Sequence, residues 1–226
     1  MAWTETQIKQ TRGIYNRAMW SFQYMRAIRA IERKISVYGK RSVPERIMVD
    51  LGTLYDHAAL KTKDGKEVKR LEGIAFTWYR KALRKKPNYY NAVWGIARIY
   101  WHHEDQRALP YALKAYRMHK KYSETNKEGF ALNVANVYVS LKQYTKAELW
   151  YKKCLTTRPR EDWLGIYLNM THLYRDWEKP KLALRYAQKA LAEFKKKPLA
   201  FRKTVGAQSW LLGIKRTIRT KNIKRV

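Results

Sequence analysis

The residues able to do chemistry fall into two groups, a cluster of histidines and acids and a large excess of cations. His102, His103, Glu104 and Asp105 are all metal-ligating types. Because they are consecutive at an expected helix end, their side chains diverge, and a solvated turn explains them better than a metal site. The only cysteine, Cys154, has no partner for a disulfide or a zinc cage and occupies a small-residue position. No phosphate-binding glycine loop or nucleophile elbow is present, so we expect neither an enzyme nor a cofactor.

Cations outnumber anions along the whole chain. The sequence holds 49 Lys and Arg against 18 Asp and Glu, a net charge of +31. The ends are the most basic, with nine basic and two acidic residues in 1–44 and eight basic and no acidic ones in 199–226. Such a charge repels itself unless counterions or an anionic partner neutralise it. Two interpretations stay open, a generally basic proteome and a surface that binds a polyanion.

Many of these cations occur in short runs, several of them at the ends of expected helices. There they also complement the negative end of the helix dipole, so a single run does not establish a site. Together, however, the runs would release many counterions on meeting RNA or a ribosomal surface, which gives salt-sensitive binding. The candidate anion-binding residues are Lys85, Lys86, Lys120, Lys121, Lys195, Lys196, Lys197, Lys215, Arg216, Arg219, Lys221, Lys224 and Arg225.

Composition and patterning predict a folded, all-helical chain. Hydrophobic residues make up 46% of the 226 residues, and glycine and proline are few. The apolar residues recur at intervals of three and four, without the alternation typical of strands. No apolar run is long enough to span a membrane, and the N-terminus lacks the apolar core of a signal peptide. With a single cysteine, these features favour a reducing compartment, and we expect a cytoplasmic protein.

Helix-start signals mark the N-terminal part. Thr4 and Gln7 form a capping-box pattern, with Trp3 and Ile8 placed to pack across it. We expect one continuous apolar stripe from there to a stop at Gly39. Its members are Ile14, Ala18, Phe22, Met25, Ile28, Ile31 and Ile35.

The rest of the chain divides into helices separated by short polar breaks. Ser42 and Glu45, with Pro44 between them, suggest a second capping box. Breaks this short make consecutive helices pack antiparallel. The expected helices cover about 45–60, 67–86, 89–103, 109–123, 127–141, 144–157, 162–177, 180–196 and 199–219.

The helix pairs share one recurring pattern of small and large residues. Its clearest copy runs from Glu128 to Glu161, a period of 34 residues. The next copy lies in 162–197, and an earlier one in 45–88 is stretched by an insertion of eleven residues. A looser fourth copy lies in 89–127, where His119 replaces a usually small residue. Small residues allow the two helices of a pair to approach closely, while large ones fill the space between pairs. The clearest copy consists of Ala131, Val134, Ala135, Tyr138, Ala147, Tyr151, Cys154 and Pro159.

This pattern resembles the tetratricopeptide repeat, W-x2-L-G-x2-Y followed by A-x3-F and P. The resemblance covers residues 45–197 as about four helix pairs, 45–88, 89–127, 128–161 and 162–197. It implies an all-α, right-handed superhelical array of antiparallel pairs, an α-solenoid. Residues 1–44 would then form an N-terminal cap or degenerate repeat, and 198–226 a capping helix with a basic tail.

The resemblance also implies where a partner would bind, because the first helices of such repeats line a concave groove that holds a peptide or a protein helix. We therefore expect a non-enzymatic scaffold with an acidic protein partner, and RNA or ribosome binding as the alternative. Some family members grip a terminal carboxylate with Lys and Asn, but Leu132 replaces the first Lys here. That substitution argues against such a clamp. The candidate groove residues are Trp94, Arg98, Trp101, Asn136, His172 and Arg175.

Overall fold

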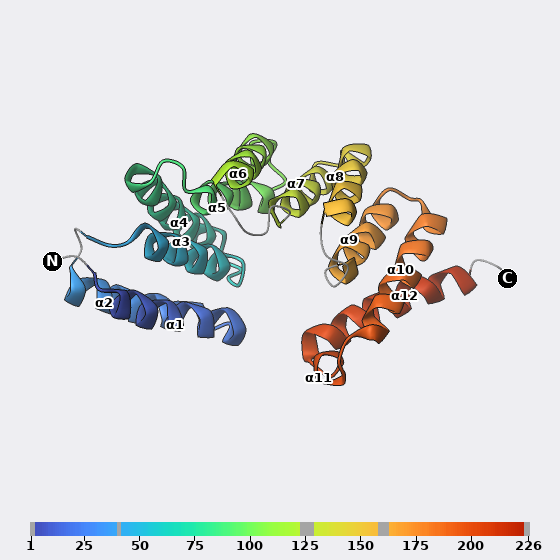
Figure 1. Ribbon diagram of the computed structural model, residues 1–226, viewed down its shortest axis with the longest axis horizontal. Helices are drawn as coiled ribbons and strands as arrows, with labels where there is room; N and C mark the ends of the chain where they lie inside the picture. The colour runs from blue at the N-terminus through green and yellow to red at the C-terminus, as the bar shows by residue number, and fades with distance from the viewer. Residues whose placement is uncertain (1–2, 40–41, 123–128, 158–162, 224–226) are drawn as a thin grey trace. The chain divides into compact units, whose positions relative to one another are not determined.

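The structure is a computed structural model that describes residues 3–39, 42–122, 129–157 and 163–223. Within these ranges the regular structure is helical throughout and no strand occurs, which confirms the predicted all-α class. None of the described helices combines the length and the apolarity that crossing a membrane requires. The helices in Figure 1 are α1 Glu5–Ser21, α2 Tyr24–Tyr38, α3 Glu45–Ala59, α4 Gly65–Lys85, α5 Tyr90–His102, α6 Ala108–Tyr122, α7 Gly129–Ser140, α8 Tyr144–Thr157, α9 Trp163–Asp176, α10 Pro180–Lys196, α11 Leu199–Arg202 and α12 Val205–Ile223.

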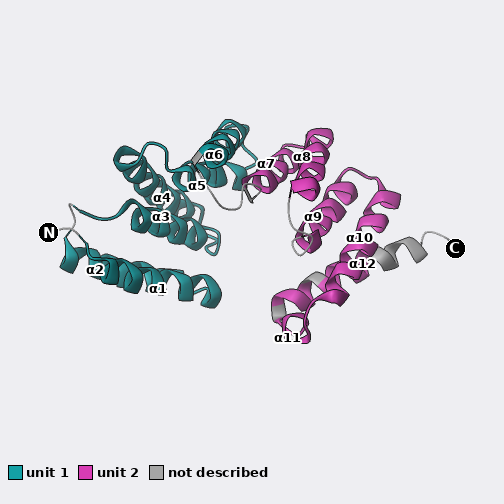
Figure 2. Cartoon of the chain, viewed as in Figure 1, with its two compact units in different colours: residues 1–123 teal, residues 124–226 magenta. Residues whose placement is uncertain are grey.

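The chain forms two compact units, residues 1–123 and 124–226 (Figure 2). In unit 1, α3 packs on α4 and α5 on α6, and α4 also contacts α5. In unit 2, α7 packs on α8 and α9 on α10, with α12 covering α10. Antiparallel pairs therefore stack on their neighbours within each unit, as the pattern predicts. The division at residues 45, 89, 128, 162 and 198 stays a prediction.

Small residues make the close helix contacts that the repeat pattern requires. Ala75 and Ala82 on α4 are fully buried, and so is the ring of Tyr79 between them. Tyr79 packs against Gly52 of α3 and Gly95 of α5, where an added Cβ would come within 3 Å of the ring. A large ring on α4 thus fills the space that two glycines leave open, and this contact joins two neighbouring pairs.

In unit 2, aromatic stacking joins the two helices of one pair. Tyr174 of α9 stacks on Tyr186 of α10 with the ring centroids 5.2 Å apart, and on Trp177 at 6.1 Å. Cys154 is buried in α8, as the sequence suggests for a small-residue position. Ile214 of α12 is also buried, so this helix extends the apolar core beyond the last repeat.

The N-terminal helices confirm one start signal and overturn two other expectations. The Thr4–Gln7 capping box is present, and Trp3 is buried. The apolar stripe does not run to Gly39 without a break, because Phe22 has φ 58° and ends α1 in a left-handed conformation. Phe22 was expected on the buried stripe and is instead 64% exposed. At α3 the N-cap is Pro44 with no side-chain cap, so the predicted box of Ser42 and Glu45 is wrong.

Candidate functional site

Unit 1 has a trough whose walls come from α1, α3 and α5, the first helices of their pairs. The cavity measures about 610 Å³. Its lining includes Arg12, Val49, Asp50, Trp94 and Arg98. The full lining is therefore mixed, with cations, two carboxylates and several aromatic rings, of which Trp94 is the largest. Such a lining suits a polar segment better than a purely apolar one.

Arg98 lies in this trough with its guanidinium already bound within the protein. Its Nε donates to Asp56 Oδ2 at 2.5 Å, and a terminal nitrogen donates to the Tyr79 hydroxyl at 3.2 Å. The Tyr79 and Thr53 hydroxyls lie 3.3 Å apart. Only 15% of the Arg98 side chain and 1% of the Asp56 side chain are exposed. Arg98 therefore joins α5 to α3 and α4, and its capacity for a partner is reduced.

A second ion pair closes the α1 side of the trough. Arg12 Nε donates to Asp50 Oδ2 at 3.1 Å, across 38 residues of sequence. Burial raises the pKa of Asp50, although the charge of Arg12 opposes that shift. Arg46 and Lys86 line the rim with exposed side chains. The carboxylates of the trough are thus paired internally, while cations remain at its edge.

The two tryptophans of α5 lie together, as their spacing of seven residues requires. The Trp94 and Trp101 rings are 6.1 Å apart between centroids, and both are half-buried. Trp101 also stacks on His102 at 5.3 Å. Of the two tryptophans only Trp94 lines the trough, where it lies with Tyr15, Tyr89 and Tyr90.

Unit 2 has a larger groove, lined by α9, α10 and α12. Its volume is about 1350 Å³. The exposed side chains of His172 and Arg175 face it from α9, and Leu212 and Arg216 face it from α12. Burial and the nearby charge of Arg175 lower the pKa of His172, so the imidazole is neutral at pH 7. This groove therefore offers apolar contact, a neutral histidine and cations along one path.

The structure thus distributes the predicted groove residues over both units. Trp94, Arg98 and Trp101 belong to unit 1, whereas Asn136, His172 and Arg175 belong to unit 2. Asn136 lies on α7, half-buried, and accepts a hydrogen bond of 2.6 Å from the Tyr151 hydroxyl.

Sequence reasoning missed the contributions of α1 and α12 to the two cavities. Arg12 lines the trough from α1, and Leu212 lines the groove from α12. Neither helix carries the repeat pattern, so the repeat register assigned no groove-facing positions to them.

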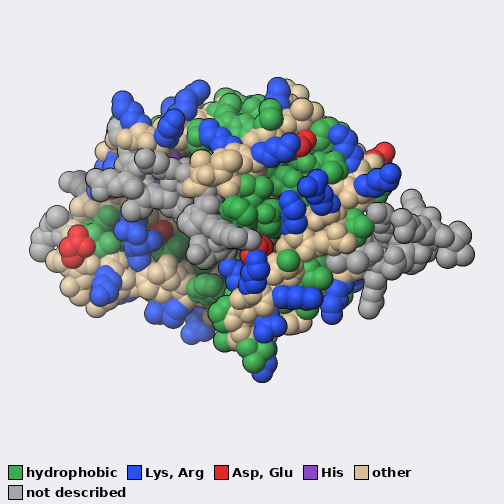
Figure 3. Space-filling view, turned by 45° about the vertical axis from the view of Figure 1, so that its right-hand side comes forward, with side chains coloured by type: hydrophobic (Ala, Val, Ile, Leu, Met, Phe, Trp, Pro, Cys, Tyr) green, Lys and Arg blue, Asp and Glu red, His purple; other side chains and the backbone are tan. Residues whose placement is uncertain are grey.

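The predicted anion-binding residues lie in several different settings, and Figure 3 shows Lys and Arg side chains scattered over the visible face. Lys85 donates to the Val43 carbonyl at 2.9 Å, and Lys196 pairs with Glu193 at 2.8 Å. The ammonium of Lys86 lies 5.3 Å from the centre of the Tyr89 ring. Lys197 is half-buried at the end of α10. Lys85, Lys86 and Lys196 are exposed despite these contacts, and so are Lys120, Lys121, Lys195, Lys215 and Arg216.

Four of the predicted residues cannot be placed in this way. Arg219 and Lys221 belong to α12, but their side chains are not among those described. Lys224 and Arg225 lie outside the described residues altogether.

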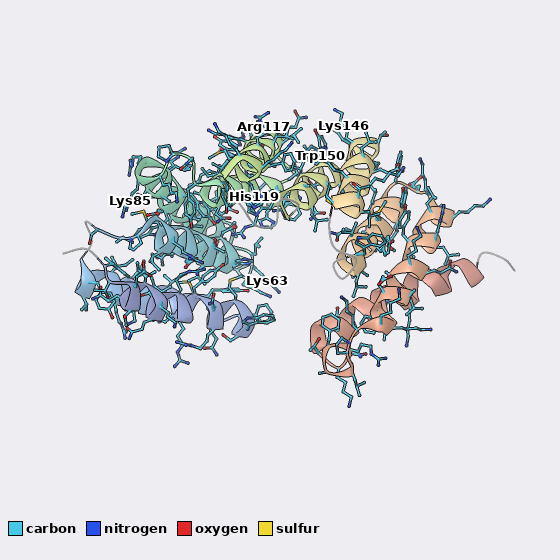
Figure 4. All side chains as sticks on the ribbon, viewed as in Figure 1. Lys63, Lys85, Arg117, His119, Lys146 and Trp150 are labelled. Atoms are coloured by element: carbon cyan, nitrogen blue, oxygen red, sulfur yellow. The ribbon has the colours of Figure 1, made fainter. Side chains whose placement is uncertain are left out.

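The second helices carry a repeated pair of an aromatic ring and a lysine three residues later. The ammonium of Lys81 lies 4.5 Å from the Trp78 ring centre on α4, and that of Lys153 lies 4.8 Å from Trp150 on α8. On α10, Lys189 lies 5.0 Å from Tyr186. Trp150 is labelled in Figure 4, where Lys146 marks the same helix. Each pair keeps a cation close to a flat apolar surface.

Two residues of the histidine-acid cluster at 102–105 pair with side chains outside the cluster. His103 Nε2 lies 2.8 Å from Glu72 Oε1 of α4. The Asp105 carboxylate accepts from the Arg107 guanidinium at 2.6 Å. In the part of the chain that the structure describes, no three metal-ligating side chains gather.

Comparison with known proteins identifies the repeat. A family model for the tetratricopeptide repeat matches residues 130–161. The structure resembles that of TTC0263, a thermophilic TPR protein of Thermus thermophilus, with a TM-score of 0.63 and 20% identity. The alignment covers 90% of this chain and 98% of that one. No curated protein matches the sequence.

Proposed function

Since the chain contains a tetratricopeptide repeat and has the fold of a tetratricopeptide-repeat protein, we propose that it is a non-enzymatic scaffold that binds a segment of a partner protein. The observation that carries the proposal is the groove of about 1350 Å³ between the α9, α10 and α12 side chains of unit 2. A cleft of this size accommodates several residues of a bound segment. The trough of unit 1 is smaller, and its ion pairs already occupy much of its polar surface.

The partner segment is acidic. Arg175, Lys181 and Arg216 line the groove of unit 2 with one acidic residue, Glu178, and the exposed Arg175 guanidinium also donates to Asp176 Oδ1 at 3.2 Å. Guanidinium groups pair with carboxylates through two parallel hydrogen bonds, which gives geometric specificity as well as affinity. Leu212 supplies an apolar contact within the same groove. The segment would therefore carry carboxylates next to at least one apolar side chain.

Affinity purification from the native cell, followed by titration of the recovered partner, tests this proposal. The variant Arg175→Glu/Arg216→Glu is expected to lose the partner, because it reverses two charges that line the groove. Arg185→Glu/Lys195→Glu makes the same change in net charge at exposed positions of α10 outside the groove lining. The groove is refuted if both variants retain the partner equally.

RNA or ribosome binding is the second candidate, favoured by the charge of +31 and by the lysines held over Trp78, Trp150 and Tyr186. Aromatic rings stack on unpaired bases, and neighbouring cations contact phosphates. Filter binding at increasing salt tests it, with a steep fall in affinity as the expected result. Nuclease treatment before affinity purification separates the candidates, since a protein partner survives it and an RNA tether does not.

We also propose a cytoplasmic location. The only cysteine is buried in α8 and has no second cysteine with which to form a disulfide in this chain. Such cysteine usage is typical of proteins in a reducing compartment. Fractionation of the native cell tests this placement, and recovery in an exported fraction would contradict it.

A further inference from the structure

One end of unit 1 exposes large apolar side chains next to two helix turns. Trp20 is 87% exposed, Phe22 64% and Met25 38%, all in or beside the α1–α2 turn. Leu60, at the end of α3, is 47% exposed. Figure 1 shows the α1–α2 and α3–α4 turns at the same end of the unit, and a shared hollow lined by Phe22, Met25 and Lys61 joins them. We call Trp20, Phe22, Met25 and Leu60 the turn patch. Clustered exposure of this kind marks an interaction surface.

The backbone at Phe22 has a conformation that is unfavourable for a bulky residue. Phe22 ends α1 with φ 58° and ψ 18°, the left-handed conformation that glycine adopts without strain. A bulky residue is uncommon in this conformation and strained by it. The ring makes an edge contact with Tyr24, whose ring centroid lies 6.2 Å away, but most of its surface faces solvent. Glu104, Lys142 and Glu178 also have positive φ just after helices, so it is the exposure of the Phe22 ring, and not its backbone alone, that marks the patch.

Cations surround the patch. The ammonium of Lys61 lies 5.1 Å from the centre of the Phe22 ring, and Arg26 lines the same hollow together with Glu67, which is itself paired with Arg70. Lys63 is exposed in the α3–α4 turn and is labelled at this end of the unit in Figure 4. Residues 17–29 and 60–70 together hold eight basic side chains and two acidic ones. Projecting aromatic rings in a basic setting match the two parts of a lipid interface, acyl chains and anionic headgroups.

We infer that the turn patch binds the surface of a membrane that contains anionic lipids. Trp20 and Phe22 would enter the boundary between headgroups and acyl chains, where amphipathic aromatic rings are favoured. Lys61, Lys63 and Arg26 would remain at the headgroup phosphates, each cation contributing to the attraction. The contact lies at the surface, in keeping with described helices that do not span a bilayer. This inference is independent of the grooves and of the partner proposed for them.

Vesicle flotation of the full chain, treated with nuclease, tests the inference. Vesicles of phosphatidylcholine alone are compared with vesicles that also contain phosphatidylglycerol. The chain is expected to float with the anionic vesicles only. Trp20→Ala/Phe22→Gly is expected to weaken this partitioning at least about tenfold, because it removes both inserted rings. Lys61→Glu/Lys63→Glu is expected to weaken it by about tenfold or more at low salt.

Two matched controls exclude general effects of hydrophobicity and charge. Val37→Ala/Leu149→Ala removes two other exposed apolar side chains, which are 78% and 62% exposed. Lys114→Glu/Arg117→Glu makes the same charge reversal on α6 of unit 1. Each control is expected to change partitioning by less than about twofold, since an isolated exposed side chain or a charge outside the patch contributes little.

Phe22→Gly also provides a check on folding, since it relieves the strained turn. Its melting temperature is expected to be equal to or above that of the parent, so any loss of vesicle binding cannot be ascribed to unfolding. Equal flotation of the parent and Trp20→Ala/Phe22→Gly would overturn the inference. So would a parent chain that ignores vesicles and forms a dimer in sedimentation that Trp20→Ala/Phe22→Gly abolishes, because the patch would then hold a second copy.

Discussion

Replacing Gly95 by alanine is expected to loosen unit 1 at the contact between its helix pairs. The new Cβ would overlap the Tyr79 ring, with even the third-nearest atom, Cε2, at 2.7 Å. The ring cannot retreat, because Gly52 meets its other side and a Cβ there would lie 2.6 Å away. Its hydroxyl is also held by Thr53 and Arg98. Overpacking costs about 1–3 kcal/mol, and alanine recovers about 1 kcal/mol in helix propensity. Since several ring atoms are overlapped at once, we expect a net loss of about 2 kcal/mol.

Thermal unfolding followed by circular dichroism measures this loss as a fall of about 4–8 °C in melting temperature. Gly73→Ala on α4 is the matched control, because a Cβ at Gly73 meets nothing within 4 Å. This control is expected to gain about 0.5–1 kcal/mol. In a Tyr79→Leu background, Gly95→Ala should become neutral or stabilising. If Gly95→Ala stabilises the parent chain as Gly73→Ala does, the proposed contact between glycine and ring is refuted.

Three further predictions concern buried polar groups. Burial, with the charge of Arg98, lowers the pKa of His57 to about 4, so the unfolded chain takes up the proton first and stability falls as pH drops below about 6.5. Unfolding at pH 7.5 and pH 5 should differ by about 1 kcal/mol from this group after solvent screening, and His57→Gln should remove that part. Arg98→Leu, which leaves the Asp56 carboxylate buried and unpaired, should cost about 3 kcal/mol in urea unfolding, and Asp56→Leu/Arg98→Leu should recover most of it. Cys154 should resist thiol reagents until the chain unfolds, and rapid labelling of the native protein would contradict its burial.

The fold could be predicted because its information is local and repeated. Alanines at fixed spacing, such as Ala75 and Ala82, predict where the two helices of a pair approach closely. A large residue between them, such as Tyr79, predicts the ring that fills the space between neighbouring pairs. The break at Phe22 could not be predicted in this way. The apolar residues keep their helical spacing across Phe22, and no glycine at this position indicates a left-handed conformation. The capping box of Ser42 and Glu45 was likewise not formed, because Pro44 is the N-cap of α3 and no side chain caps the helix.

The candidate site was less predictable because its contacts join residues far apart in sequence. The repeat register placed Arg98 on a groove-facing position, but it carried no sign of Asp56, 42 residues earlier, as the partner of the guanidinium. Arg12 and Asp50 are separated by 38 residues and belong to helices without a shared repeat. The groove role of Trp94, His172 and Arg175 rests on their placement beside cavities and stays a prediction.

The ion pairs also bear on where the excess positive charge must act. The buried acidic residues in the described part of the chain are Asp50, Asp56 and Glu72; Asp50 and Asp56 pair with Arg12 and Arg98, and Glu72 shares a hydrogen bond with His103. Carboxylates that are paired inside the fold do not neutralise the charge of lysines on the surface. The surplus of +31 is therefore carried by the surface, where solvent ions alone oppose it. An acidic segment, RNA or an anionic membrane would each relieve that repulsion on binding, so salt should weaken all three interactions, and only the matched charge reversals distinguish which surface each one uses.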